Sequence, residues 1–359
     1  MRTKAHPMLV LGIDTSCDDT SCAVVRNGRD ILSSIVSSQT DLHRDFGGVV
    51  PELACRSHIL NLLPVLDASL RGASVNLAQI DCIAVTHRPG LIGALLIGLT
   101  AAKAFACLLG KPLVGLDHIA SHLYSVHMCN PPVPSEAEGE AGFPCVGLVV
   151  SGGHTQLYYC RDHIHRELLG GTQDDAAGEA YDKVAGILGL GYPGGSAIDA
   201  TAKKGDRKAI RFKRAFLDKD SLDFSFSGIK TAVLYHVRGQ NAGRYRRVRQ
   251  PDRPPPRKTG SAADIAAGFQ EAVVDVLVAK TVLAARKKRV GTVTVSGGVA
   301  ANSRLREAMT KECRLRGLNV LFPLPAMCTD NAAMVAGLGY HYARAGKMAS
   351  LAIDAAAKI

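Results

Sequence analysis

Several signatures that would place a protein outside the cytoplasm are missing from this sequence. None of its ten cysteines forms a CxxC pair, and several lie inside apolar runs, as Cys82, Cys107 and Cys145 do. Such cysteines are expected to act as small core hydrophobes in a reducing compartment. Residues 1–7 are polar with no apolar signal region behind them, and no stretch is expected to approach a membrane span. These absences argue against a secreted or membrane protein and predict a cytoplasmic one.

Acidic residues are too few to balance the basic ones. The chain has 43 Lys and Arg against 32 Asp and Glu, which gives a formal net charge of +11. An excess of this size suggests a polyanionic partner, with nucleic acid as the first candidate, although a generally basic proteome is the alternative. The basic residues concentrate in 203–214 and 244–258, which favours a basic patch over positive charge spread evenly across the surface.

Two sequence patterns each occur twice along the 359 residues, a length that suggests two domains. Residues 8–25 and 145–159 both predict a strand, a polar turn and a second strand. The runs DCIAVTHRPGLIGALLIGLTAAKAF and VGTVTVSGGVAANSRLREAM both predict a strand, a glycine turn and a helix, and VSGG begins at both Val150 and Val295. The repetition predicts a duplicated α/β architecture.

Two segments are predicted to be surface loops, and a third is predicted to be a helix. Residues 129–142 are rich in Pro, Glu and Gly, and residues 239–260 are rich in Arg and Pro. Apolar residues recur at helical spacing in 330–344, which is expected to pack back onto the first lobe. The predicted domains are an N-terminal lobe of 1–128 joined by 331–359, and a C-terminal lobe of 143–330.

The pentapeptide HIASH carries the sharpest chemical signal. Spacing of four residues places His118 and His122 on one face of a helix, close enough to share a metal ion. The alternative is a pair of partly buried histidines at a helix surface. A zinc peptidase of the HExxH type needs a glutamate after the first histidine, where this sequence has Ile119, so the general base is missing.

A third ligand is expected from Asp330, in a polar turn before the last helix. Two histidines and one carboxylate with open positions suit Fe(II) best and Zn(II) next. Asp330 could instead cap the helix that follows it, or serve both purposes.

Glycine turns suggest where an anionic ligand binds. The turns at Ser151–Gly153 and Ser296–Gly298 let a phosphate or carboxylate approach backbone N–H groups, although tight turns use the same residues freely. Asp182 could accept a hydrogen bond from a ribose or hydroxyl group, and the turn 193–195 could pass close to the same ligand. The alternative is an acidic helix N-terminus, as at 174–175, followed by an ordinary turn.

Eight ordered blocks resemble the bacterial type of the tRNA N6-adenosine threonylcarbamoyltransferase family, once called O-sialoglycoprotein endopeptidases. The resemblance covers almost the whole chain. The blocks are GIDTSCDDT at Gly12, GGVVPELACRSH at Gly47, HIASH at His118, LVVSGGHTQL at Leu148, DDAAGEAYDKVAGILGLGYPGG at Asp174, DFSFSGIKTAV at Asp223, VSGGVAANSRLR at Val295 and CTDNAAM at Cys328.

The resemblance implies a fold and a reaction. The fold would be two duplicated ribonuclease-H-like lobes of the actin, Hsp70 and sugar-kinase superfamily with an interlobe cleft. The enzyme would be an acyltransferase that moves threonylcarbamoyl from threonylcarbamoyl-AMP to N6 of adenosine 37 in tRNAs that read codons beginning with adenine. The alternatives are a metallopeptidase and a non-catalytic nucleotide-binding scaffold. Expected partners are tRNA, a shorter paralogue and a P-loop ATPase subunit.

The resemblance also implies site residues. His118, His122 and Asp330 would be catalytic and would hold one Fe(II) per subunit, with Zn(II) possible. The adenylate or its threonylcarbamoyl group would contact Val149, Val150, Ser151, Gly152, Gly153, Asp182, Gly195, Asp199 and Asn302. Two features depart from the family pattern: Arg88 stands where a small residue is usual, and the segment after Gly239 is longer. His58 is assigned to structure or to a partner surface.

Overall fold

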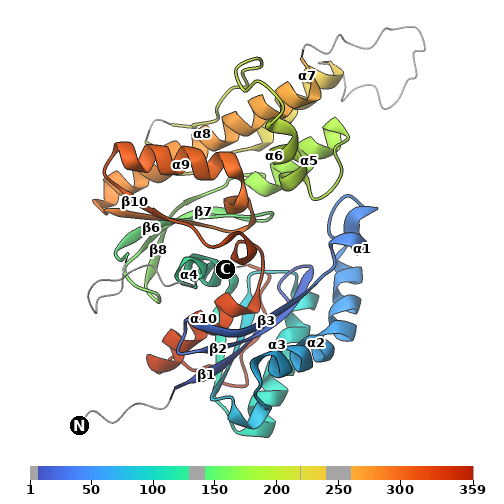
Figure 1. Ribbon diagram of the computed structural model, residues 1–359, viewed down its shortest axis with the longest axis vertical. Helices are drawn as coiled ribbons and strands as arrows, with labels where there is room; N and C mark the ends of the chain where they lie inside the picture. The colour runs from blue at the N-terminus through green and yellow to red at the C-terminus, as the bar shows by residue number, and fades with distance from the viewer. Residues whose placement is uncertain (1–6, 129–141, 219, 240–259, 359) are drawn as a thin grey trace. The chain divides into compact units, whose positions relative to one another are not determined.

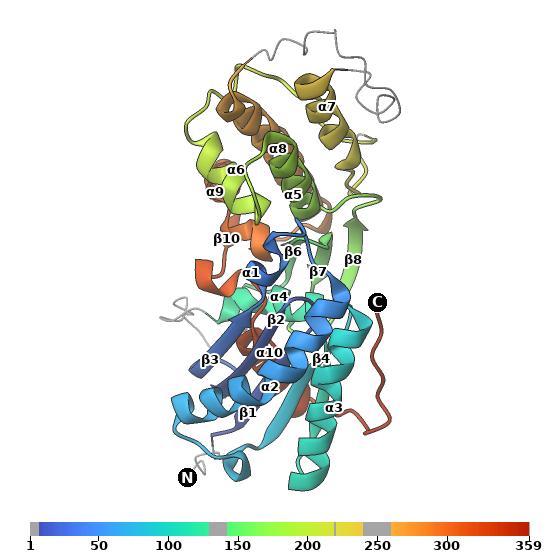
Figure 2. The same ribbon diagram turned by 90° about the vertical axis from the view of Figure 1, so that its right-hand side faces the viewer.

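The computed structural model describes residues 7–128, 142–218, 220–239 and 260–358 (Figures 1 and 2). The predicted loops 129–142 and 239–260 lie outside these residues except at their ends. The chain forms two compact units. Unit 1 comprises 1–143, 161–166 and 322–359, and unit 2 comprises 144–160 and 167–321.

Unit 1 is built on a five-stranded sheet in the order β3-β2-β1-β4-β5. Its strands are β1 (Leu9–Asp14), β2 (Asp19–Arg26), β3 (Asp30–Ser38), β4 (Cys82–Arg88) and β5 (Leu113–Asp117). The central strand β1 pairs antiparallel with β2 and parallel with β4, which pairs parallel with β5. The strand, turn and strand predicted in 8–25 are confirmed as β1 and β2.

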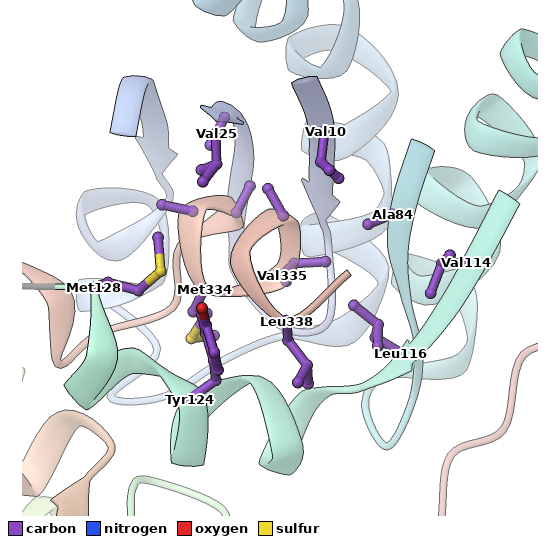
Figure 3. Packing of buried hydrophobic residues seen from close by; sticks show 14 of the residues in the cluster. Val10, Val25, Ala84, Val114, Leu116, Tyr124, Met128, Met334, Val335 and Leu338 are labelled. Atoms are coloured by element: carbon purple, nitrogen blue, oxygen red, sulfur yellow. The ribbon is translucent and has the colours of Figure 1, made fainter. Parts of the chain in front are cut away.

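Helices cover both faces of this sheet because successive residues of β1 point to opposite sides. Leu11 and Ile13 pack in one cluster with α2 (Pro51–Ala73) and α3 (Ile92–Leu109). Val10 packs in the other cluster with α4 (His118–Tyr124) and α10 (Ala332–Arg344), as Figure 3 shows. The short helix α1 (Thr40–Arg44) precedes α2, and 3-10 turns lie at Leu77–Gln79, Ser125–His127 and Pro325–Met327.

The last helix lies very close to the central strand. A Cβ on Gly12 of β1 would lie 2.2 Å from the carbonyl oxygen of Ala332 and 2.9 Å from the Cβ of Ala336. No side chain fits at this position, and the small residues of α10 permit the close approach. This packing fixes the N-terminal end of α10, and therefore also Asp330, relative to β1.

Helix α3 corrects the expectation that no stretch approaches a membrane span. Its 18 residues have a mean hydropathy of 2.0, so by length and composition it is long and apolar enough to cross a membrane. The helix packs on β4 and α2, and core helices of globular proteins meet the same criterion. Cys107 is also corrected: it is exposed because it lies off the stripe of α3 that packs on the sheet, whereas Cys82 and Cys145 are buried.

Unit 2 repeats the plan of unit 1. Its sheet has the order β10-β9-β6-β7-β8, in which β6 pairs antiparallel with β7 and parallel with β9. The strands are β6 (Cys145–Val150), β7 (Thr155–Cys160), β8 (Arg166–Gly171), β9 (Thr292–Ser296) and β10 (Asn319–Leu321). The helices are α5 (Ala177–Leu188), α6 (Gly194–Ala202), α7 (Ser227–Arg238), α8 (Ala262–Lys288) and α9 (Ser303–Leu315), with a 3-10 turn at Gly298–Ala301.

The matching strand order confirms the predicted duplication. In each unit a hairpin supplies the first two strands, and the first strand of that hairpin then pairs in parallel with a strand that precedes a helix. The repeated patterns arise because each sheet needs the same buried strands and the same strand-to-helix connection.

Candidate metal centre and substrate-binding residues

Two histidines face each other at the start of α4. The carboxylate of Asp117, the last residue of β5, accepts a hydrogen bond from the backbone N–H of Ala120 at 3.0 Å and caps the helix. The helix therefore begins at His118, and His122 follows one turn later. Their ring centroids lie 4.6 Å apart, and both side chains are buried.

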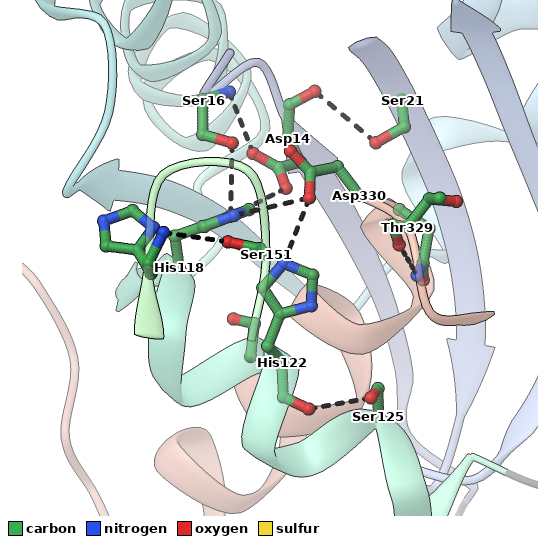
Figure 4. Close-up of polar contacts among 12 residues, drawn as sticks. Asp14, Ser16, Ser21, His118, His122, Ser125, Ser151, Thr329 and Asp330 are labelled. Atoms are coloured by element: carbon green, nitrogen blue, oxygen red, sulfur yellow. Dashed lines mark hydrogen bonds and ion pairs between the residues drawn. The ribbon is translucent and has the colours of Figure 1, made fainter. Parts of the chain in front are cut away.

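Asp330 completes this group from a segment that is distant in the sequence. Its Oδ1 lies 3.0 Å from Nε2 of His122 and 3.5 Å from Nε2 of His118 (Figure 4). The cap of α10 is Asn331, whose side chain accepts from the backbone N–H of Met334 at 3.0 Å. The capping alternative for Asp330 is therefore wrong, and its carboxylate faces the histidines.

His118 and Asp330 strongly shift each other's pKa values. Burial alone would lower the pKa of His118, but the carboxylates of Asp330 and Asp14 hold it well above its ordinary value. Burial would raise the pKa of Asp330, but His118 and His122 hold it well below the usual range. A charged carboxylate is thus kept in a partly buried position by positive charge beside it.

The donor set fits a metal ion. One ligand atom from each of His118, His122 and Asp330 lies within 4.8 Å of the others, and no further group of this kind occurs in the described ranges. Two imidazoles and one carboxylate bind borderline divalent cations and leave coordination positions open for a substrate. A cation here would also replace the proton that His118 holds.

Sequence reasoning missed two residues that contact His118. Its Nδ1 lies 3.1 Å from Oγ of Ser16 and 3.4 Å from Oδ2 of Asp14. Both residues lie where β1 ends, within the block GIDTSCDDT that carried part of the family resemblance. A carboxylate at the end of a buried strand was the available signal, but nothing local links it to a histidine about a hundred residues away.

In unit 2, the hairpin turn after β6 contains five of the predicted substrate-binding residues. Val149 and Val150 end the strand, and Ser151, Gly152 and Gly153 form the turn. A Cβ on either glycine would meet nothing within 4 Å, so the backbone has open space beside it. The N-terminus of α5 lies against the turn, because Gly178 donates its N–H to the carbonyl of Ser151 at 3.1 Å.

The two SGG turns lie next to each other. Gly297 has φ +88°, and a Cβ there would lie 2.5 Å from the carbonyl oxygen of Val150. Only glycine suits such a position.

Asp182 and Gly195 lie at a second place in unit 2. Oδ1 of Asp182, on α5, accepts from the backbone N–H of Gly194 at 2.7 Å and so holds the start of α6. Gly195 follows in the first turn of α6, with open space at its Cα. The carboxylate thus has a positioning contact in addition to any contact with a ligand.

Asp199 and Asn302 form a third group with their neighbours. The hydroxyl of Ser303 donates to Asp199 at 2.9 Å. Asn302 caps α9 by accepting from the N–H of Leu305 at 2.9 Å, and its Nδ2 donates to Oε1 of Gln270 at 2.7 Å. The nine predicted substrate-binding residues of unit 2 thus lie in three groups, and the second and third are adjacent because Gly195 and Asp199 are one turn apart on α6.

A cavity of about 340 Å³ lies beside the third group. Ser303 and Gln270 line it, together with charged side chains from Lys203, Arg207, Glu271 and Arg304. Arg304 and Glu271 form a two-pronged ion pair at 2.6 and 2.8 Å, which lowers the pKa of Glu271. The volume lies at the lower end of the range of small-molecule sites.

Several other residues singled out in the sequence have structural roles. His58 is buried and bonds to the hydroxyl of Thr20 at 2.7 Å and to the carbonyl of Cys17 at 2.9 Å. Asp174 accepts from backbone N–H groups at the start of α7, and Asp175 pairs with Lys183 and Lys230. Arg88 reaches Asp117, the residue that caps α4, at 3.8 Å.

Comparison with known proteins identifies the family. The model of the tRNA N6-adenosine threonylcarbamoyltransferase family (TsaD) matches residues 30–337. A protein of that name from Symbiobacterium thermophilum is 50% identical over 347 residues, covering 97% of this chain and 95% of the relative. One from Anaeromyxobacter dehalogenans is 48% identical, covering 96% of this chain and 97% of the relative.

Among solved structures, HypF from T. kodakarensis resembles this chain with a TM-score of 0.61 at 16% identity. The likeness covers 95% of this chain and 48% of HypF, and it supports the fold alone. The sequence matches to the family and its members extend over nearly the whole chain, so the chain belongs to the tRNA N6-adenosine threonylcarbamoyltransferase family.

Proposed function

We propose that this chain transfers the threonylcarbamoyl group of threonylcarbamoyl-AMP to N6 of the adenosine just 3′ of the tRNA anticodon and releases AMP. One observation carries the proposal: a chain that belongs to this transferase family by nearly full-length similarity also places His118, His122 and Asp330 within 4.8 Å of one another. The metallopeptidase alternative is disfavoured because Ile119 occupies the position of the required glutamate.

His118, His122 and Asp330 would hold the metal, with Fe(II) preferred over Zn(II) for this donor set. When bound, the ion supplies a Lewis acid that polarises an acyl oxygen. The protein keeps both imidazoles turned toward Asp330 and buries the group, so little reorganisation is needed when substrate arrives. Polarisation matters here because an exocyclic adenine amine is a weak nucleophile.

The residues of unit 2 would bind the adenylate. The backbone N–H groups of Gly152 and Gly153 would approach the phosphate, because neither residue has a side chain to block it. Asp182, Asp199 and Asn302 offer a carboxylate or an amide for hydroxyl groups and for the threonylcarbamoyl moiety. Departing AMP would leave as an anion stabilised by the same N–H groups.

Exposed basic residues offer a surface for tRNA. Between residues 203 and 213 six side chains are basic and exposed, namely Lys203, Lys204, Arg207, Lys208, Arg211 and Lys213. Phosphate contacts of this kind supply much of the affinity for nucleic acid. The second basic segment, 244–258, falls outside the described residues.

The expected partners are a shorter paralogue and a P-loop ATPase subunit. Helices α2 and α3 pack against each other and expose large apolar side chains: Ile59, Leu60 and Leu63 on α2, and Ile92 and Leu96 on α3. This α2–α3 apolar surface suits a helical partner of related fold. Leu60→Asp should weaken co-purification with the paralogue, whereas Leu108→Asp, at the far end of α3, should not.

The absence of disulfides among the described cysteines agrees with a cytoplasmic location. The nine cysteines in the described ranges are all free, which is typical of a reducing compartment.

The test is transfer of labelled threonylcarbamate to unmodified tRNA, with and without the two partner subunits. Label in tRNA that depends on this chain supports the proposal. Adenylate binding without transfer under all conditions would instead favour a non-catalytic scaffold.

A further inference from the structure

The two nitrogens of His118 face different groups. Nε2 lies 3.5 Å from Oδ1 of Asp330, on the side where the ligand atoms gather. Nδ1, on another edge of the ring, lies 3.1 Å from the hydroxyl of Ser16 and 3.4 Å from Oδ2 of Asp14. Because the ring has contacts on both edges, its orientation is fixed from two sides (Figure 4).

The loop that supplies Asp14 and Ser16 is firmly held. Oδ1 of Asp14 accepts from the backbone N–H of Ser16 at 3.0 Å, and the carbonyl of Ser16 accepts from the N–H of Leu91 at 2.9 Å. The intervening Thr15 donates its hydroxyl to the carbonyl of Ala94 at 2.8 Å. Asp14 is 1% exposed and Ser16 3%, so neither side chain is available to bulk water.

Oδ2 of Asp14 is buried and makes no hydrogen bond within the described part of the chain, and it lies 3.4 Å from Nδ1 of His118. An isolated buried carboxylate oxygen is costly, and the approach to Nδ1 of His118 offsets that cost. The carboxylate oxygen beside Nδ1 can only accept, so it favours a proton on that nitrogen, and the hydroxyl of Ser16 can accept from the same N–H. When a cation takes the place of the other proton of the imidazolium, the proton on Nδ1 stays and Nε2 offers its lone pair to the ion.

His122 provides a contrast within the same group. Its Nε2 also faces Asp330, but its Nδ1 is buried and makes no hydrogen bond within the described ranges. The side chain therefore relies on helix packing for its orientation, whereas His118 has two dedicated partners.

We propose that Asp14 and Ser16 are positioning residues for the metal centre, which hold the proton of His118 on Nδ1 and present Nε2 to the ion. The inference rests on the proposed metal function of His118. Carboxylate partners of this kind orient a ligating imidazole and increase its basicity, and their removal typically lowers metal affinity by about 10- to 100-fold. Asp14 should matter more than Ser16 because it carries the charge.

The experiment measures metal affinity of the full chain by chelator competition with Co(II) and Zn(II), without any assay of transfer. Asp14→Asn should weaken binding by about 10- to 100-fold and shift the Co(II) absorption spectrum, and Ser16→Ala should have a smaller effect in the same direction. Asp14→Glu, which keeps the charge, should recover part of the loss. Ser69→Ala is the matched control, since this buried hydroxyl lies elsewhere in unit 1 and bonds to the hydroxyl of Ser33 at 2.9 Å.

A double-mutant cycle separates positioning from general damage to the fold. In a His118→Ala background, Asp14→Asn should cause no further loss of affinity, because its effect acts through the imidazole. An equal loss in both backgrounds, or wild-type affinity and spectrum in Asp14→Asn, would overturn the proposal. If Asp14→Asn does not fold, as judged by its thermal melt, Ser16→Ala is carried through the same cycle. Wild-type protein that binds neither ion would overturn the metal centre itself, a failure distinct from that of the inference.

Discussion

The two units share a strand order, yet their first hairpin turns carry opposite chemistry. The turn between β1 and β2 in unit 1 contains Asp18 and is flanked by Asp14 and Asp19, and Asp14 lies beside the histidine of the metal group. The equivalent turn of unit 2 contains Gly152 and Gly153, with open space beside the backbone. Carboxylates favour a cation, and bare N–H groups favour an anion. Under the proposed function, the duplicated fold provides one place for a metal and another for a phosphate.

If unit 1 supplies the metal, removing its ligands should have the largest effect. His118→Ala and His122→Ala should each lower metal affinity so far that the purified protein carries no ion, with only weak residual binding of added metal, and should reduce transfer at least about a hundredfold, because Lewis-acid stabilisation is worth several kcal/mol. Metal content and labelled tRNA are measured on the same samples, with circular dichroism as the check on folding. Full transfer by a metal-free double variant would contradict the assignment.

Substitution of the proposed substrate-binding residues of unit 2 should leave metal binding unchanged. Asp182→Ala and Asn302→Ala should weaken binding of threonylcarbamoyl-adenylate by about 10- to 100-fold, as expected when a hydrogen bond to a charged or strongly polar group is lost. Calorimetry with the adenylate, together with metal analysis, checks both parts. Asn302→Ala should also lower stability by about 1 kcal/mol because it removes the cap of α9.

Unchanged adenylate affinity in both variants would place the pocket elsewhere. Ser225→Ala serves as the control, because its hydroxyl contacts Asp174 in another part of unit 2.

Substitutions in the two basic segments should show which of them contributes to tRNA binding. The segment outside the described residues carries Arg244, Arg246, Arg247, Arg249, Arg253 and Lys258. Serine at these positions should lower tRNA affinity and reduce the salt slope by about one for each phosphate that is no longer neutralised, with adenylate binding unchanged. If the slope stays the same, tRNA binding is assigned to residues 203–213, and Arg207→Ser with Lys208→Ser should then change it.

A histidine cluster should make unit 1 the acid-sensitive unit. The ring of His163 packs 4.1 Å from that of His341 and 4.7 Å from that of His127. Burial, reinforced by neighbouring positive groups such as Arg29, lowers the pKa of His127 and His341 to about 4 and that of His163 to about 2. A histidine in the unfolded chain has a pKa near 6.5. Between about pH 6.5 and 4, these three histidines therefore bind protons in the unfolded chain but not in the folded one.

The free energy of unfolding should therefore fall as the pH is lowered through that window. The urea midpoint measured by circular dichroism should decrease from pH 7 to pH 5, and His163→Gln should reduce the decrease. His236→Gln, a histidine of unit 2, is the control. An identical decrease in wild type and His163→Gln would show that the cluster does not cause it.

How much of this was visible in the sequence depends on whether a feature is local. The buried strands and the strand-to-helix units were predictable because each leaves an apolar run and a glycine turn. His118 and His122 were visible because one helical turn relates them. The contact of Asp14 with His118 could not be predicted from the sequence. It forms only when β1 and β5 lie in one sheet and α4 follows β5.

One error and one alternative that the sequence left open have the same origin. Cys107 looks like a core residue in an apolar run, but the rotation of α3 turns it to the surface. Asp330 could have been a helix cap as well as a metal ligand, but its neighbour Asn331 caps α10, and this choice depends on how the chain enters the helix. Neither outcome could be settled without the packing of the helix on its sheet.

The most direct test of the account is to titrate metal-free enzyme with Fe(II) under anaerobic conditions and follow transfer of labelled threonylcarbamate to tRNA with the partner subunits present. The account predicts that the rate rises with added Fe(II), reaches a plateau at one equivalent per chain, and does not rise in Asp330→Ala. A metal-free enzyme that works at the full rate, or an Asp330→Ala variant that is activated like wild type, would contradict it.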